Sequence, residues 1–115
     1  MKKILLLSVL FAFFGCTNSV KNQSIVLNNN LIKVDENHYE TIIDGNKIIL
    51  DSYIVPFQIP YYIVLKSEKL LTLSEAENIA IKYIKPRGCT SPLKRRTDLD
   101  KSNFDKTEWL IGVEC

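Results

Sequence analysis

The sequence predicts an α+β fold in which a small antiparallel sheet of about four strands packs against one amphipathic helix. Three observations support this class: a tight-turn signal between two β-branched runs, apolar residues at helical spacing in one later segment, and alternating apolar residues at the C-terminus. Of the 115 residues, 46% are hydrophobic and 24% are charged, which is typical of a globular protein. A chain of this length has room for one small domain.

A β-hairpin is the first element predicted in the globular part. Residues 39–43 and 47–53 are rich in β-branched and aromatic side chains, and they flank an Asp-Gly-Asn turn at residues 44–46. Asp and Gly both tolerate the positive φ that a two-residue turn requires. The two runs are therefore expected to pair as antiparallel strands.

Two more strands follow from the same kind of pattern. Pro56 and Pro60 interrupt it because proline cannot donate to a strand ladder, and residues 61–66 then resume it. Residues 108–115 form the last predicted strand, whose one face carries Trp109, Ile111 and Val113. Together with the hairpin, these segments give the expected four strands.

One amphipathic helix is predicted between the last two strands, from about Ser74 to Lys85. Apolar residues recur there at helical spacing, and charged residues occupy the other face. Ser74 and Glu77 have the spacing of a capping box. Pro86 disfavours a helical conformation at Lys85, and Gly88 permits a sharp exit. The helix followed by a Trp-containing strand resembles PepSY-like and cystatin-like small domains, and this resemblance implies the fold alone.

The N-terminus has the organisation of an export signal. Lys2 and Lys3 precede an apolar run at residues 4–14, which Gly15 and Cys16 follow. A helix of that length is roughly 16 Å long, about half of the hydrocarbon core of a bilayer, so it is too short for a permanent span.

Without the two lysines, thirteen basic residues balance thirteen acidic ones. No nucleic-acid partner is expected, because the global positive field of such binders is absent.

The segment Phe13–Cys16 (Phe-Phe-Gly-Cys) resembles the lipobox of bacterial lipoproteins, in which signal peptidase II cuts before a cysteine that carries diacylglycerol. Gly15 and Cys16 match its two most demanding positions, whereas the first Phe replaces the usual Leu. The resemblance implies a signal peptide at residues 1–15 and membrane anchoring through a lipid on Cys16. It favours the outer membrane, facing the periplasm, because Thr17 replaces the Asp that commonly retains lipoproteins in the inner membrane.

Secretion without an anchor is the alternative, because residues 17–19 (Thr-Asn-Ser) permit a signal peptidase I cut after them. Residues 16–30 are Asn-rich and are expected to form a flexible tether with an average reach of about 20 Å. A short edge strand is the alternative for residues 25–27. The α+β domain is expected at residues 31–115.

The two cysteines that remain after lipidation are Cys89 and Cys115. In the oxidising compartment that an export signal implies, they are expected to form a disulfide. Its loop of about 25 residues corresponds to roughly 3 kcal/mol of stability. The alternative, a catalytic thiol at Cys89, needs a basic partner, and His38 is the only histidine in the chain.

A run without acidic residues lies between Glu77 and Asp98. Its basic side chains are a candidate anion-binding patch for phosphate, lipopolysaccharide, anionic lipid or an acidic protein surface. The alternative is a solvated face balanced by the acidic residues just downstream. The candidate residues are Lys82, Lys85, Arg87, Lys94, Arg95 and Arg96.

Two weaker signals concern ligands. Four aromatic residues near the prolines are expected either in a groove for a peptide or glycan or in the core, namely Tyr53, Phe57, Tyr61 and Tyr62. Asp98 and Asp100 have a spacing seen among metal ligands, but the segment lacks the glycine and the glutamate of a calcium loop. No metal site and no cofactor are therefore predicted.

These features predict an exported lipoprotein whose domain is a non-catalytic binding or interaction module at the cell envelope, with an envelope protein or an anionic envelope polymer as partner. The sequence has no glycine-rich phosphate loop, nucleophile elbow or paired-carboxylate motif that would indicate an enzyme. Two alternatives remain: a small secreted or anchored enzyme or inhibitor that acts on envelope polymers, and a phage- or plasmid-type exclusion lipoprotein.

Overall fold

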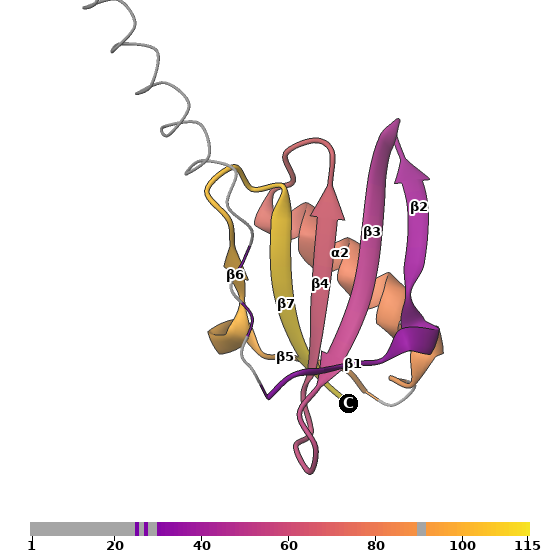
Figure 1. The fold of residues 1–115 in the computed structure, drawn as a ribbon, viewed down its shortest axis with the longest axis vertical. Coiled ribbons are helices and arrows are strands. Elements are labelled where there is room, and N and C mark those ends of the chain that lie inside the picture. The colour runs from indigo at the N-terminus through magenta and orange to yellow at the C-terminus, as the bar shows by residue number, and fades with distance from the viewer. Residues whose placement is uncertain (1–24, 26, 28–29, 90–91) are drawn as a thin grey trace, which may run out of the picture.

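The computed structural model describes residues 25, 27, 30–89 and 92–115, which form a sheet layer and a helix layer (Figure 1). The strands make one seven-stranded sheet in the order β1-β3-β4-β7-β5, in which β2 also pairs with β3 and β6 with β7. Every pairing is antiparallel. The α+β class is confirmed, whereas the prediction of about four strands is too small.

Four of the strands are long and correspond to the predicted ones: β2 (Tyr39–Ile43), β3 (Asn46–Ile54), β4 (Tyr61–Ser67) and β7 (Glu108–Glu114). The strands missing from the prediction have two residues each: β1 (Ile32–Lys33), β5 (Lys94–Arg95) and β6 (Lys101–Ser102). Such short segments carry no alternating signal, because alternation needs at least four residues to be recognised. Short 3₁₀ helices complete the described chain: η1 (Asp35–Asn37), η2 (Lys85–Arg87) and η3 (Thr97–Leu99).

The β2–β3 hairpin has the predicted turn. Ile43 pairs with Asn46, so only Asp44 and Gly45 form the loop. Their φ angles are 52° and 76°, as a two-residue turn with two left-handed positions requires. Residues 55–60, which contain both prolines, then join β3 to β4 as a second antiparallel pair.

The helix α2 (Leu73–Ile84) begins one residue earlier than predicted, and its capping box is a different one. Thr72 is the N-cap: its Oγ1 accepts from the N–H of Glu75, and its own N–H donates to the Glu75 carboxylate. The prediction that Ser74 and Glu77 form the capping box was wrong. The helix begins earlier because Leu71, the residue before Thr72, has both of its backbone groups hydrogen-bonded. The Leu71 N–H donates to the carbonyl of Lys106, and its carbonyl accepts from Trp109 Nε1.

The end of α2 also differs in one detail. Lys85 keeps a helical backbone, with its N–H bonded to Ile81, although Pro86 follows it. Pro86 is tolerated because it lies in the first turn of η2, where its missing N–H has no partner to lose. The chain then leaves through Gly88, whose φ of 118° is left-handed and allows the sharp exit that was predicted.

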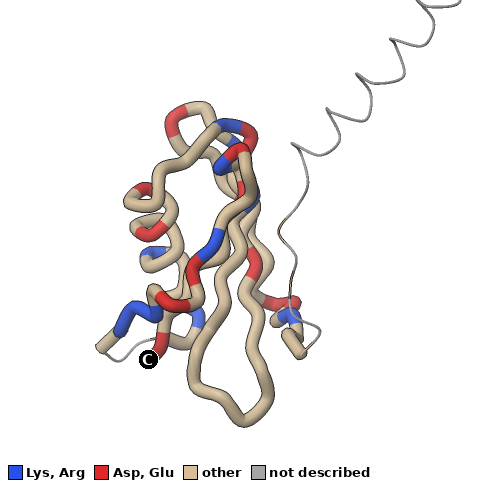
Figure 2. The backbone as a smooth tube through the Cα atoms, turned by 90° about the vertical axis from the view of Figure 1, so that its left-hand side faces the viewer, with Lys and Arg blue, Asp and Glu red and all other residues tan. Residues whose placement is uncertain are grey.

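The core lies between α2 and one face of the sheet. The edge-on view in Figure 2 shows the helix on one side of the sheet. Trp109, Ile111 and Val113 share this face of β7, as predicted, and each is at least nine-tenths buried. The sheet contributes aliphatic side chains from β3 and β4, and the helix contributes Ala76, Ala80, Tyr83 and Ile84. The two alanines have short side chains, which allow close approach of the helix to the strands.

The opposite face of the sheet is partly covered by the chain itself. Residues 94–102 lie along β7, where a Cβ on Gly112 would lie only 2.7 Å from the carbonyl oxygen of Arg96 and from Leu99 Cβ. The backbone N–H of Ile25 donates to Glu108 Oε1 at 3.2 Å. Ile25 and Leu27, the described residues of the segment considered as an edge strand, lie outside the strands.

Cys89 and Cys115 lie at disulfide distance, with Cα atoms 5.3 Å apart. The pair therefore joins the segment after η2 to the end of β7.

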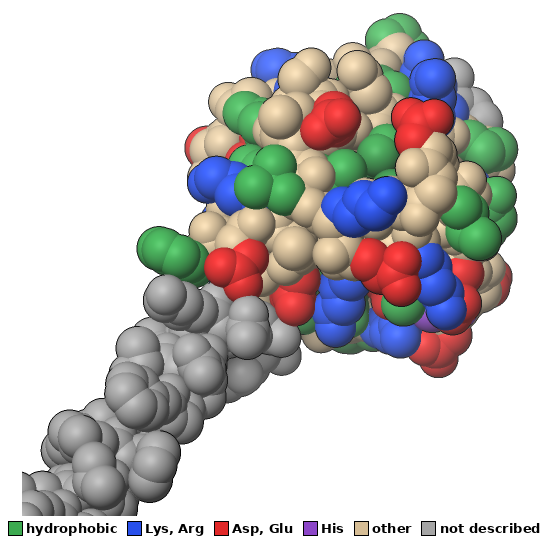
Figure 3. Space-filling view, turned by 90° about the horizontal axis from the view of Figure 1, so that it is seen from above, with side chains coloured by type: hydrophobic (Ala, Val, Ile, Leu, Met, Phe, Trp, Pro, Cys, Tyr) green, Lys and Arg blue, Asp and Glu red, His purple; other side chains and the backbone are tan. Residues whose placement is uncertain are grey.

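On the face seen in Figure 3, acidic and basic side chains are interspersed with hydrophobic ones and form no continuous positive surface. Cys16 and the predicted signal peptide lie outside the described residues.

Candidate binding groove

A groove runs between β2 and α2 because the helix does not cover the whole sheet. The main sheet contacts of α2 are with β7, β4 and β3. Two cavities of about 350 and 340 Å³ follow β2 and share the residues Ile43, Asn78 and Ile79. We call them together the β2–α2 groove.

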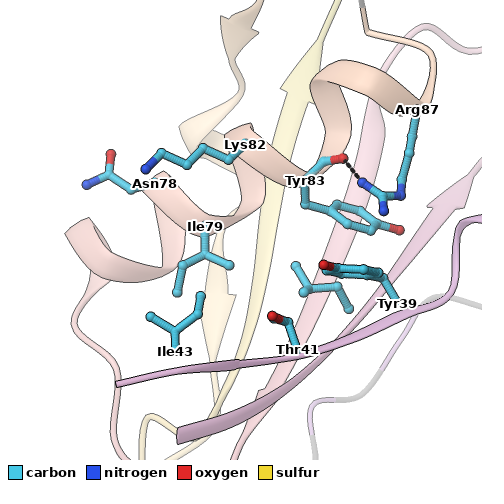
Figure 4. A pocket seen from close by; sticks show the side chains of 9 residues that line it. Tyr39, Thr41, Ile43, Asn78, Ile79, Lys82, Tyr83 and Arg87 are labelled. Atoms are coloured by element: carbon cyan, nitrogen blue, oxygen red, sulfur yellow. Dashed lines mark hydrogen bonds between the residues drawn. The ribbon is translucent and has the colours of Figure 1, made fainter. Parts of the chain in front are cut away.

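The floor of the groove is the helix-facing side of β2. Tyr39, Thr41 and Ile43 alternate along the strand, and all three line the first cavity. Figure 4 shows them opposite Ile79 and Tyr83 of the helix. Tyr39 and Ile43 are 42% and 39% exposed, so the groove presents apolar surface to solvent.

Arg87 lies at one end of the groove, over the rings of Tyr39 and Tyr83. Its guanidinium carbon lies 4.6 Å from the ring centre of Tyr39 and 4.7 Å from that of Tyr83. Its Nη1 donates to the carbonyl of Tyr83 at 2.6 Å (Figure 4). These contacts hold the Arg87 side chain in place. Because a guanidinium has five N–H groups, donors are left for a ligand.

The Tyr83 ring is held in place by a hydrogen bond from its hydroxyl. The hydroxyl of Tyr83 donates to the backbone carbonyl of Asn37, and the Asn37 side chain donates to Ser52. Burial raises the pKa of Tyr83 above its usual value, so its hydroxyl stays protonated as a donor. Arg87 therefore contacts a ring, that of Tyr83, whose position is set by a hydrogen bond.

The charge at this end of the groove is positive. Lys82 and Arg87 line the first cavity, and no acidic side chain lines it. Neither cation forms an ion pair with another residue in the described part of the chain. The site thus combines apolar surface with two cations that a carboxylate or phosphate would neutralise.

The other predicted basic residues are placed differently. Arg95 bonds to the carboxylates of Glu77 and Asp100, and Arg96 bonds to those of Asp98 and Glu114. The hydrogen bond from Arg96 lowers the pKa of Asp98. Burial would lower the pKa of Arg95, but the bonds to its two carboxylates outweigh burial and raise it. Lys85 and Lys94 are exposed, outside the residues that line the groove.

The aromatic residues near the prolines are separated. Phe57 is fully exposed in the β3–β4 connection, and Tyr61 packs against the core. Tyr53 pairs with Tyr62 across β3 and β4, with both side chains on the sheet face that α2 does not cover. These four side chains therefore do not form one groove.

The remaining polar residues singled out by the sequence are paired. Cys89 lies against Cys115, and His38 bonds to Asp51 at 2.7 Å and to Glu40 at 3.1 Å. Within residues 30–89 and 92–115 no three His, Cys, Asp or Glu side chains are arranged to hold a metal ion. No helix in the described part of the chain has the length and hydropathy to cross a membrane.

Comparison of the chain with protein-family models, with curated proteins and with solved structures gave no match. Lys82 and Arg87 are among the basic residues predicted from the sequence, whereas the groove beside them is not predicted. The β-branched run next to the hairpin turn predicts that residues 39–43 form a strand, which the structure confirms. What it does not indicate is where the helix lies, and that position creates the groove.

Proposed function

We propose that the chain is an exported bacterial lipoprotein, anchored in the cell envelope through Cys16, whose domain is a non-catalytic binding module. In this proposal the β2–α2 groove holds an envelope protein. The supporting observation is the groove itself, with its exposed apolar floor and its unneutralised cations Lys82 and Arg87. Exposed apolar surface bordered by polar groups is typical of interaction sites.

The start of the domain is consistent with an anchor. Ile25 bonds to Glu108, whose side chain lies on the sheet face opposite α2. The groove lies on the helix side. Eight residues lie between Cys16 and Ile25, and if they form the predicted tether its average reach is roughly 16 Å. A lipid on Cys16 would therefore tether the domain by one face and leave the groove on the other side.

The experiment has an anchor arm and a groove arm. Intact mass and membrane fractionation are expected to show an acylated Cys16, and Cys16→Ala is expected to lose both acylation and membrane retention. For the groove, a photo-cross-linking residue in place of Asn78 is expected to capture an envelope protein, whereas the same residue in place of Lys66, on the other face, is not. An unlipidated wild-type chain, or equal capture from both positions, would contradict the proposal.

A further inference from the structure

The free edge of β2 offers backbone hydrogen bonds. Hydrogen-bonded and non-hydrogen-bonded pairs alternate along an antiparallel ladder, and Ile43 with Asn46, which flank the two-residue turn, form a hydrogen-bonded pair. Thr41 and Tyr39 then also bond to β3, and the N–H and C=O groups of Glu40 and Ile42 point away from it. In the described chain β2 pairs with β3 alone.

This edge has few of the features that protect strand edges from pairing. Proteins commonly blunt an exposed edge with a proline, a bulge or charged side chains. β2 has neither proline nor bulge, and its register with β3 is uninterrupted over five pairs. Ile42 is 70% exposed. Glu40 is the strand's one charged side chain, and it is already bonded to His38 and Lys47.

An added strand would place its side chains in the groove. Residues of a new strand that lie opposite Tyr39, Thr41 and Ile43 point to the same side of the sheet as these residues. The side chains opposite Thr41 and Ile43 would meet the apolar wall at Ile79. The side chain opposite Tyr39 would meet Arg87, which lies over the Tyr39 ring.

We propose that the groove binds an extended, acidic segment of a partner protein, which adds to β2 as an antiparallel strand. The inference rests on the proposed function and specifies its partner. Read from its N-terminus, the segment has an apolar residue, any residue, an apolar residue, any residue and then Asp or Glu. The two unspecified residues bond to the backbone of Ile42 and Glu40, and the acidic side chain pairs with Arg87.

Charge favours a foreign segment over a second copy of this chain. In a symmetric antiparallel pairing of two β2 strands centred on Thr41, Ile43 of one copy would lie opposite Tyr39 of the other. The groove-facing residues of β2 are Tyr39, Thr41 and Ile43, so a second copy brings no acidic side chain to Arg87 from these positions. A partner with Asp or Glu there neutralises the guanidinium in a partly buried, bidentate contact.

The test uses the lipidated full chain in detergent and the blocked peptide acetyl-Ser-Val-Thr-Val-Thr-Glu-Ser-amide, with calorimetry as the readout. A second peptide has Gln in place of Glu. Wild type and Lys85→Gln, a matched control outside the groove, are expected to bind the Glu peptide at least about tenfold more tightly than the Gln peptide. In Arg87→Gln this preference is expected to disappear. Proline in the position opposite Ile42 is expected to abolish binding, because it removes an N–H of the ladder.

Three results would overturn the inference: no binding of the Glu peptide at about 1 mM, equal affinities of wild type for the two peptides, or a β2-mediated dimer that the peptide fails to dissociate. The outcome is separable from that of the proposed function. If the peptide fails but Asn78 still captures an envelope protein, the groove binds its partner in another way. If both fail, the proposed function fails with the inference.

Discussion

The guanidinium of Arg87 lies 4.6 Å from the ring centre of Tyr39, and this contact joins the segment after α2 to the edge strand β2. In the described chain, β3 is the only strand that pairs with β2, so the contact adds a link from β2 to the helix layer. The contact lies at one end of the β2–α2 groove, where both residues line the first cavity. Tyr39 and Arg87 are 48 residues apart, so no local sequence pattern reveals the pair.

Replacing Tyr39 tests this contact. Tyr39→Ala is expected to lower the free energy of unfolding by about 0.5–1 kcal/mol, the usual range for an exposed cation–π pair, with urea unfolding as the measurement. Tyr39→Phe keeps the ring and is expected to unfold like the wild type. A Phe variant as unstable as the Ala variant would show that the hydroxyl, and not the ring, matters.

Gly112 is expected to be intolerant of any side chain. A Cβ there would lie 2.7 Å from the carbonyl oxygen of Arg96 and from Leu99 Cβ, and overpacking of this kind costs about 1–3 kcal/mol. Gly112→Ala should therefore lower the urea midpoint markedly. Leu99→Ala in the same chain should restore only part of the loss, because the Arg96 oxygen belongs to the backbone. An unchanged midpoint in the single variant would show that residues 94–102 do not lie against β7 as described.

His38 is expected to make stability depend on pH. Hydrogen bonds to Asp51 and then to Glu40 raise its pKa above the ordinary value. The contribution is fully present below about pH 6.5, the pKa in the unfolded chain, and is lost as pH rises through the higher folded pKa. The urea midpoint should therefore fall above about pH 6.5.

The control for this pH dependence is His38→Gln, in which the fall above that pH should be absent. Glu40 does not confuse the comparison, because the hydrogen bond from His38 lowers its pKa. Its contribution is present above the unfolded pKa of about 4.3 and is lost only in more acidic solution. Identical profiles for the two proteins between pH 6 and 8 would assign the dependence to other groups.

The pair Cys89 and Cys115 is expected to supply a large share of the stability. Their sequence separation is 26, and a disulfide closing such a loop contributes roughly 3 kcal/mol. The double variant Cys89→Ser/Cys115→Ser should lose about this amount, and reduction of the wild type should give the same urea curve. Cys16→Ser is the control, and it should unfold like the wild type. A reductant effect on the double variant would contradict this assignment.

The elements that the sequence predicts correctly are those with a local signal. Asp44 and Gly45 fix a turn by their own backbone preferences, and Trp109 marks a strand through alternation with its neighbours. The missing parts depend on distant contacts. β5 and β6 are strands only because β7 lies beside them, and Arg95 is withdrawn from the predicted patch by carboxylates that come from different elements.

The start of α2 shows most directly that a tertiary contact can decide between two equally good local patterns. Ser74 and Glu77 satisfy the capping-box pattern as well as Thr72 and Glu75 do. In the structure the second pair forms the capping box. Leu71 is buried and both of its backbone groups are hydrogen-bonded, so the helix begins two residues later, at Leu73. Glu77 instead bonds to Arg95.

These two serine and threonine positions give opposite expectations. Thr72→Ala removes the N-cap acceptor and should lower the free energy of unfolding by about 1 kcal/mol. Ser74→Ala lies in the first helical turn and should leave it unchanged or raise it by up to about 0.5 kcal/mol, because Ala has the higher helix propensity. Urea unfolding of the two variants side by side measures both. If Ser74→Ala were the destabilising change, the helix would begin where the sequence pattern had placed it, and the bonds at Leu71 would not control its start.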